Sequence, residues 1–193
     1  MPFARALQQR VIARLGLTHT APNPQSASFS ATGHNLAAFE ANFARGYPST
    51  DSGHRLTAYP HSFSVSAGLT ASALDVAAFS MAMDRNALLM PQTKALAWTP
   101  AVSPAGDTLP YALGWFSTRY EGVRVVWQYG LWTAISSLLL KVPDRELTLV
   151  ILANTDGLSA PYRLGGGQLE GSPWAREFLD RFVIRREPLP ASR

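Results

Sequence analysis

The sequence predicts an α+β fold in which helices cover an antiparallel β-meander. Two observations carry this prediction: apolar residues recur at helical spacing outside the centre of the chain, and four β-rich runs follow one another in its second half. These runs are 111–120, 123–129, 135–142 and 147–153, and short turns join the first to the second and the third to the fourth. With 193 residues, 47% of them apolar and 16% charged, the chain can bury a substantial core.

The first predicted element is a helix over residues 3–14. Phe3, Leu7 and Val11 recur four residues apart, and Gly16 ends the pattern. From 18 to 62 the chain is rich in Ser, Thr, Asn, Pro and Gly, so we expect a long surface loop region with one short helix at 36–45.

Two more helices are expected before the sheet. Ser72 followed by Asp75 makes a capping pair ahead of the apolar residues 76–83. Pro91 suits the first position of a helix that runs to about Trp98.

The antiparallel sheet is expected over residues 111–154. Its runs at 138–140 and 147–152 are continuously apolar, which predicts that helices cover both faces. Ser172 and Pro173 begin a final helix over 172–186, with apolar side chains at helical spacing on one side.

The charge and composition exclude several classes of partner. The net charge of +4 comes from arginines spread along the chain, without a basic stripe among aromatic residues, so we expect no nucleic-acid partner. No apolar run reaches the ~18 residues that a membrane span needs, and the first residues show no signal-peptide pattern. The sequence as given therefore predicts a cytoplasmic chain with no membrane partner.

The residue types present also exclude several kinds of chemistry. Without cysteine there is no disulfide, thiolate zinc site or Cys nucleophile. The four histidines lie in predicted loops without metal-ligand spacing, so we expect no metal and no cofactor. The two lysines, Lys94 and Lys141, follow Pro91 and Leu138 by three positions, which excludes a Ser-x-x-Lys nucleophile.

Three segments together resemble the C-terminal half of the serine β-lactamase-like family, which includes class C β-lactamases, DD-peptidases and small-ester hydrolases. Residues 10–20 are similar to the family's helix end and following turn, and 66–79 to its Ala-Gly-Gly-Leu-x-Ser-Thr-x-x-Asp-Leu-x-x-Phe segment. The most specific likeness is the order Tyr111–Trp115, Val126–Gly130, Ser136-Ser137, Val142–Asp144 and Leu152–Asn154. The resemblance implies a partial β-lactamase/transpeptidase-like fold, with residues 1–193 as a single partial domain.

The resemblance places one wall of a substrate cleft at Gln128, Tyr129, Gly130 and Leu131. Gln128 stands where the family has Lys or His, so it can form hydrogen bonds but cannot supply positive charge or exchange a proton near neutral pH. Gly130 would let substrate approach the backbone, and the N–H of Leu131 would contribute to an oxyanion hole. Trp132 and Ser136 are further candidate cleft residues; the alternative for each of these side chains is a purely structural role in the sheet.

The family's Tyr-x-Asn or Ser-x-Asn motif is absent, as is Ser-x-x-Lys. The resemblance therefore places nucleophile and general base upstream of Met1 and no catalytic residue in this chain. We expect the C-terminal portion of a serine hydrolase whose intact form, often periplasmic or secreted in this family, makes an acyl-enzyme from an ester, a β-lactam or a D-amino-acid peptide. The chain alone would be inactive. The alternatives are a non-catalytic module that binds a small ligand, and a structural half that associates, also with itself, through an exposed sheet edge.

Overall fold

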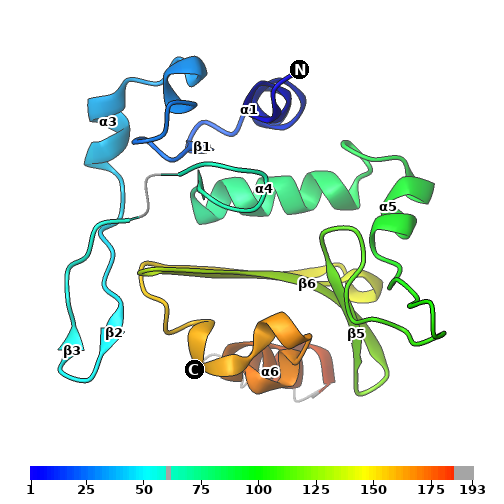
Figure 1. Ribbon diagram of the computed structural model, residues 1–193. Helices are drawn as coiled ribbons and strands as arrows, with labels where there is room; N and C mark the ends of the chain where they lie inside the picture. Colours follow the sequence, from blue (N-terminus) through cyan, green and yellow to red (C-terminus); the bar gives the residue numbers. More distant parts are fainter. Residues whose placement is uncertain (60–61, 185–193) are drawn as a thin grey trace, which may run out of the picture.

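The computed structural model of the chain describes residues 1–59 and 62–184. Four strands form one antiparallel meander in sequence order: β5 (Phe116–Tyr120), β6 (Val123–Trp132), β7 (Ile135–Val142) and β8 (Leu147–Ala153). Figure 1 shows this sheet edge-on, with α4 (Ala73–Asp84) on one face and α6 (Pro173–Leu179) on the other. The predicted α+β class, with helices covering a meander, is confirmed.

The first predicted strand is too long. Residues 111–115 form a turn instead, because Gly114 adopts a φ of 83° and the N–H of Ala112 donates to the carbonyl of Trp115 at 2.7 Å. β6 is longer than predicted and continues to Trp132. The turn between β7 and β8 is a 3-10 turn, Pro143–Arg145.

The N-terminal helix covers residues 3–15 without a break. Its parts are α1 (Phe3–Leu7), a π-helical turn (Gln8–Ile12) and α2 (Ala13–Leu15). It ends as predicted at Gly16, whose φ is 65°. The N–H of Leu17 donates to the carbonyl of Ile12 and that of Gly16 to Ala13, which is a Schellman motif.

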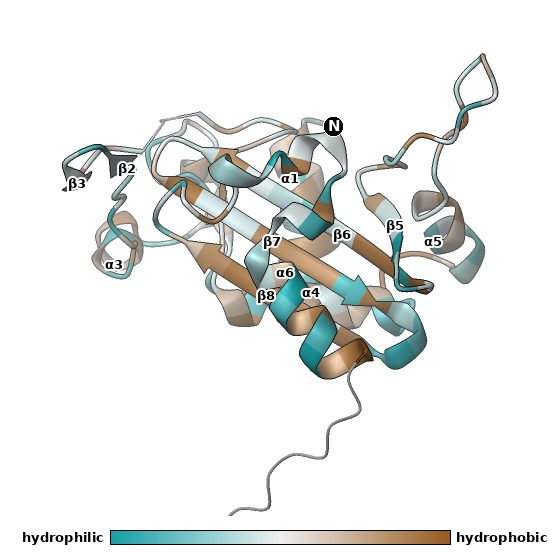
Figure 2. Ribbon diagram, turned by 90° about the horizontal axis from the view of Figure 1, so that it is seen from below, coloured by the Kyte–Doolittle hydropathy of each residue, from teal (hydrophilic) through white to brown (hydrophobic). Residues whose placement is uncertain are grey.

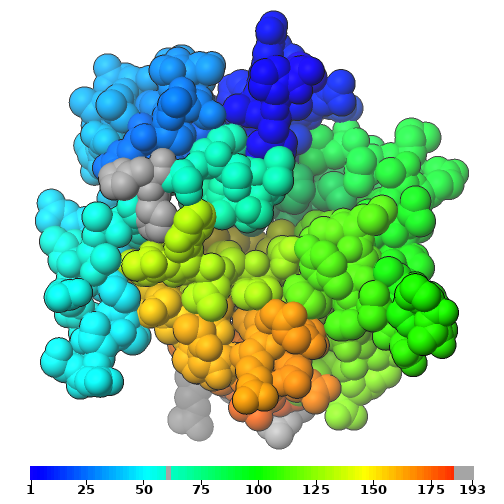
Figure 3. Space-filling view, viewed as in Figure 1, coloured from blue at the N-terminus to red at the C-terminus, as the bar shows by residue number. Residues whose placement is uncertain are grey.

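The expected loop region at 18–62 contains several short elements, and its Pro60 and His61 lie outside the described residues. The elements are β1 (Ala21–Pro22), a 3-10 turn (Phe29–Thr32), α3 (Leu36–Ala41), β2 (Ser49–Thr50) and β3 (Gly53–His54). α3 is shorter than the predicted helix at 36–45. β1 pairs with β4 (Leu69–Thr70), and β2 pairs with β3. Figure 3 shows the residues that precede α4 along the top and one side of the molecule.

The remaining helices begin where the sequence predicts. Ser72 Oγ accepts a hydrogen bond from the N–H of Asp75 at the start of α4, and Pro91 begins α5 (Pro91–Ala97). Three 3-10 turns lie between β8 and α6: Ala160–Tyr162, Leu164–Gly166 and Leu169–Gly171. α6 continues into a π-helical turn, Asp180–Ile184, and the expected helix end at Arg185 and Arg186 lies outside the described residues.

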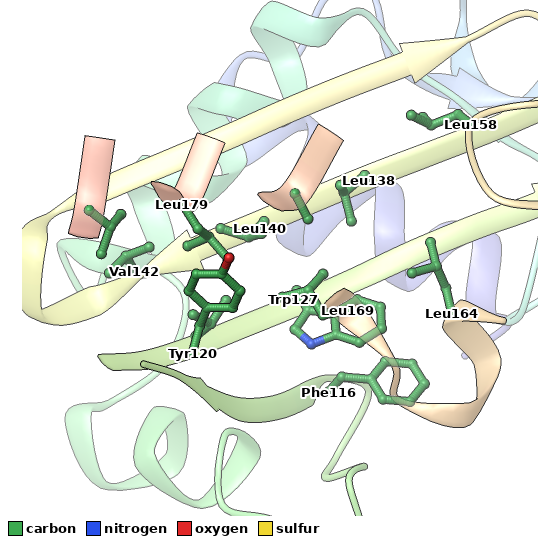
Figure 4. Packing of buried hydrophobic residues seen from close by; sticks show 13 residues of the cluster. Phe116, Tyr120, Trp127, Leu138, Leu140, Val142, Leu158, Leu164, Leu169 and Leu179 are labelled. Atoms are coloured by element: carbon green, nitrogen blue, oxygen red, sulfur yellow. The ribbon is translucent and has the colours of Figure 1, made fainter. Parts of the chain in front are cut away.

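The main core fills the space between the sheet and α6. Trp127 of β6 and Leu140 of β7 are fully buried there, together with Leu179 of α6. Figure 2 shows hydrophobic residues along β7 and β8, and Figure 4 shows core side chains gathered between strands and helix. Phe116 stacks on Trp127 with ring centroids 4.4 Å apart.

The opposite face of the sheet carries a smaller apolar cluster and a buried charge. Trp98 and Val126 belong to the cluster, on which Phe79 of α4 also packs. Lys141 is 1% exposed, and its Nζ lies 2.9 Å from Asp84 Oδ2, 2.5 Å from Ser80 Oγ and 3.0 Å from Thr148 Oγ1. This lysine therefore joins β7 to α4. The sequence pattern alone gave no indication of the pair.

Candidate functional site

A cavity of about 840 Å³ lies on the α4 face of the sheet. The N-terminal helix, α3, α4 and strands β6 to β8 surround it, and most of its lining is apolar, including Val11, Phe39, Phe79 and Leu152. Gln128 and Tyr129 contribute the β6 side of its wall.

A second hollow of about 480 Å³ lies at the end of β6. All four residues of the predicted wall, Gln128, Tyr129, Gly130 and Leu131, line it. Figure 3 shows this part of the chain at the surface, between the segment before β5 and the segment after β8. Because Gln128 and Tyr129 line both spaces, the end of β6 forms a wall shared by the two.

The side chain of Gln128 is held by three hydrogen bonds. Its Nε2 donates to the hydroxyl of Tyr111 and to the carbonyl of Gly114, both at 3.0 Å, and its Oε1 accepts from the N–H of Tyr129 at 3.0 Å. Gln128 thus ties β6 to the turn before β5. One phenol hydroxyl, that of Tyr111, is thereby fixed at the rim of the smaller hollow.

Gly130 leaves room for the side chain of the residue beside it, and any larger residue would displace the Ser137 hydroxyl. It pairs with Ser137 of β7, and a Cβ at position 130 would lie 2.5 Å from Ser137 Oγ. Leu131, the next residue, is 48% exposed. The ring centroid of Tyr129 lies 6.0 Å from that of Phe116, so Tyr129 contributes to the edge of the main core as well as to the hollow.

The other two candidate residues lie differently. Trp132 is partly exposed at the end of β6 and lines neither of these two spaces. Ser136 lines the large cavity, but it is 1% exposed and its hydroxyl donates to the carbonyl of Thr155 at 2.5 Å. The structure therefore brings Gln128 to Leu131 together at one hollow, but not Trp132.

Two side chains that line the large cavity can act as acids, Asp75 and Tyr59. The carboxylate of Asp75 is already hydrogen-bonded, and the phenol of Tyr59 is neutral. Asp75 Oδ2 accepts from the N–H of His19 and from the hydroxyl of Thr20, both at 2.8 Å, so this carboxylate fixes the turn after the first helix. Burial first, and then the nearby Tyr47, raise the pKa of Tyr59 above its usual value of 10. Tyr59 therefore stays protonated at neutral pH.

Several residues that line the smaller hollow, among them Tyr111, Ser66 and Gly165, were not predicted as site residues from the sequence. Tyr111 begins one of the family-like segments, so its motif gave a usable signal. Ser66 and Gly165 come from loops far apart in the sequence, and nothing in their local pattern predicts that they meet. Over residues 1–59 and 62–184, no three His, Asp or Glu side chains gather as a metal site, and no helix is long and apolar enough to cross a membrane.

Comparisons with known proteins fit this arrangement. The sequence profile of the Beta-lactamase family matches residues 1–167. The octameric penicillin-binding protein homologue from Pyrococcus abyssi has a TM-score of 0.68 and 16% identity, covering 93% of this chain and 42% of its own. The penicillin-binding protein from Bacillus halodurans has a TM-score of 0.63 and 17% identity. The D-stereospecific amidohydrolase from a Streptomyces species has a TM-score of 0.61 and 21% identity. Each of these two comparisons covers 81% of this chain and 45% of the other protein. Curated protein sequences give no match.

These structures define the class of the fold, which this chain shares with penicillin-binding proteins and a D-stereospecific amidohydrolase. The chain belongs to the β-lactamase family, as its resemblance predicts. It spans less than half the length of each of these structures.

Proposed function

We propose that this chain forms the substrate-binding wall of an acyl-transfer site, and that the serine nucleophile and the general base come from polypeptide outside it. In the intact enzyme, the serine would give its proton to the base and attack the carbonyl carbon of an ester, a β-lactam or a D-amino-acid peptide. The C–O or C–N bond would break, with the protonated alcohol or amine leaving (or staying attached in an opened β-lactam), and water would then hydrolyse the acyl-enzyme to free the acid and the serine. The observation that carries this proposal is the position of Gln128 to Leu131 along the smaller hollow, with Gln128 and Tyr129 also lining the large cavity.

The side chains around the hollows suit binding better than nucleophile activation. The Ser136 hydroxyl is bound to Thr155, and the Asp75 carboxylate is bound to the turn at His19. Both lysines bind other groups. Lys141 pairs with Asp84, and Lys94 donates hydrogen bonds to the carbonyls of Met83 and Asp84. A serine with neither an adjacent base nor a lowered pKa is a weak nucleophile.

The similar structures favour one group of substrates. They include a D-stereospecific amidohydrolase and a D-amino acid amidase. Their names support amino-acid amides as a substrate class for the intact enzyme, beside esters and β-lactams.

Turnover tests this proposal directly. The purified chain should hydrolyse neither nitrocefin nor a p-nitrophenyl ester above the rate of buffer. Co-expression with the polypeptide encoded upstream, carrying Ser-x-x-Lys and Tyr-x-Asn, should give activity that neither part shows alone. Hydrolysis by this chain alone, abolished by replacing one of its own serines, would contradict the proposal, as would an inactive assembled pair.

The edge of the sheet favours a second candidate function, self-association through β8. All seven residues of β8 are uncharged, all are at least partly exposed, and Leu152 is 41% exposed. In the described part of the chain β8 pairs only with β7. An apolar edge strand without charge or proline is a template for another strand. The opposite edge, β5, carries the exposed Arg119.

Leu152→Lys tests this candidate, with Leu74→Lys as the matched control on the exposed side of α4, where Leu74 is 82% exposed. If β8 mediates self-association, the wild-type chain and the Leu74 variant form concentration-dependent dimers in sedimentation experiments, whereas the Leu152 variant stays monomeric. A wild-type chain that is monomeric at all concentrations would rule this candidate out.

A further inference from the structure

We propose that the smaller hollow selects an uncharged acyl group, whose carbonyl oxygen accepts a hydrogen bond from Tyr111, over a carboxylate. This inference rests on the proposed function and names the substrate class at the same site. It follows from the charge of the lining, the orientation of one hydroxyl and the aromatic character of the wall.

The first observation is the absence of charge. None of the nine described residues that line the hollow has a charged side chain. Gln128, at the position where the family has Lys or His, contributes a neutral amide whose donors are already bonded to Tyr111 and Gly114. A carboxylate that enters the hollow would lose hydration without gaining a cation, which is unfavourable. A neutral amide or ester avoids this penalty.

The second observation is the hydroxyl of Tyr111. It accepts the N–H of Gln128 at 3.0 Å, so its own proton is left to donate to another acceptor. Tyr111 is 39% exposed and lines the hollow, which makes this proton accessible to a ligand. Gln128 acts as the positioning residue, because its second hydrogen bond to the carbonyl of Gly114 fixes the amide.

The third observation is the aromatic wall. The rings of Tyr111 and Phe116 meet edge to face with centroids 4.6 Å apart, and the ring centroid of Tyr129 lies 6.0 Å from that of Phe116. All three line the hollow. Such a surface suits an aromatic or apolar side chain attached to the acyl group.

Two probes that differ only at the acyl end test the inference: N-acetyl-phenylalaninamide and N-acetyl-phenylalanine of the same configuration. In NMR titrations of the full chain, the amide should shift the backbone signals of Gly130 and Leu131 and bind roughly 10-fold more tightly than the acid, because the acid gives up hydration with no cation beside it.

Three variants then test which groups cause the preference for the amide over the acid. Tyr111→Phe removes only the hydroxyl and should weaken amide binding roughly 3- to 10-fold, the value of one hydrogen bond. Tyr47→Phe, outside the hollow, is the matched control and should leave binding unchanged. Gln128→Lys adds a cation beside the hollow and should shift the preference toward the acid.

Several results would overturn the inference. They are equal affinity for amide and acid, amide binding that Tyr111→Phe does not weaken, and the absence of saturable shifts at Gly130 and Leu131. Since binding needs no nucleophile, these outcomes are independent of the turnover experiment, and either proposal can fail while the other stands.

Discussion

The two faces of the sheet are packed in different ways. The face toward α6 is closed by a continuous apolar core in which Trp127, Leu140 and Leu179 are completely buried. The face toward α4 has a smaller apolar cluster at one end, the buried Lys141 near α4, and the 840 Å³ cavity toward the end of β6. One face is thus closed by apolar packing, while the other is left open where the candidate site lies.

This difference indicates how the site is built. Close packing on the α6 face fixes the strands, so the end of β6 keeps its shape beside two open spaces. Ion pairing and hydrogen bonds at Lys141 hold α4 against the same sheet without filling the cavity. Variants on each face can test whether stability is divided in this way.

The largest expected effect is the loss of the counter-ion on the α4 face. Asp84→Ala would leave the cation of Lys141 buried without its partner, which costs about 3–5 kcal/mol. Urea unfolding measures this change. Adding Lys141→Met to the Asp84 variant removes the buried charge and should restore much of the stability; a double variant no more stable than the single one would refute the role given to the pair.

Adjacent leucines of β7 compare the two faces directly. Leu140 is 0% exposed in the α6-face core, whereas Leu139 points to the opposite face and lines the cavity. Leu140→Ala should cost about 2–5 kcal/mol, and Leu139→Ala about 1 kcal/mol, because a side chain beside an existing space loses fewer contacts. Equal losses in thermal or urea unfolding would show that the faces are packed alike.

A smaller effect is expected at Tyr120, where β5 meets the end of α6. Its hydroxyl donates to Asp180 Oδ1 at 2.8 Å, so Tyr120→Phe should cost about 1 kcal/mol near neutral pH.

Burial, with the Asp180 hydrogen bond next, raises the pKa of Tyr120 above 10. The stabilisation is therefore complete below pH 10 and is lost as the pH rises through the raised value. Unfolding curves from pH 8 upward should show wild type and variant converging. A constant difference across this range would contradict the assignment.

The sequence predicts regular elements better than contacts between distant loops. The strands follow from β-rich runs separated by short turns. The Ser72 cap and the Gly16 helix end follow from local patterns, because hydrogen bonds within a few residues form them. The turn at 111–115 was missed, since Gly114 with its positive φ stands among strand-forming residues. Lys141 gives no signal within an apolar run, because its partners lie on other elements.

The same difference between local patterns and contacts of distant segments applies to the candidate site. Gln128 to Leu131 could be found because they form one continuous segment with a family-like pattern. The hydrogen bonds that occupy Gln128, and the presence of Ser66 and Gly165 at the hollow, depend on how separate loops meet.

Covalent labelling with a serine-directed fluorophosphonate, read by peptide mass spectrometry, tests the central claim most directly. Alone, the chain should acquire no specific label on any serine, including Ser136 and Ser137. In the assembled pair with the upstream polypeptide, the label should appear on the serine of Ser-x-x-Lys, and an excess of a neutral acyl amide should reduce it. A specific label on a serine of this chain would show that the nucleophile lies within it and would contradict the account.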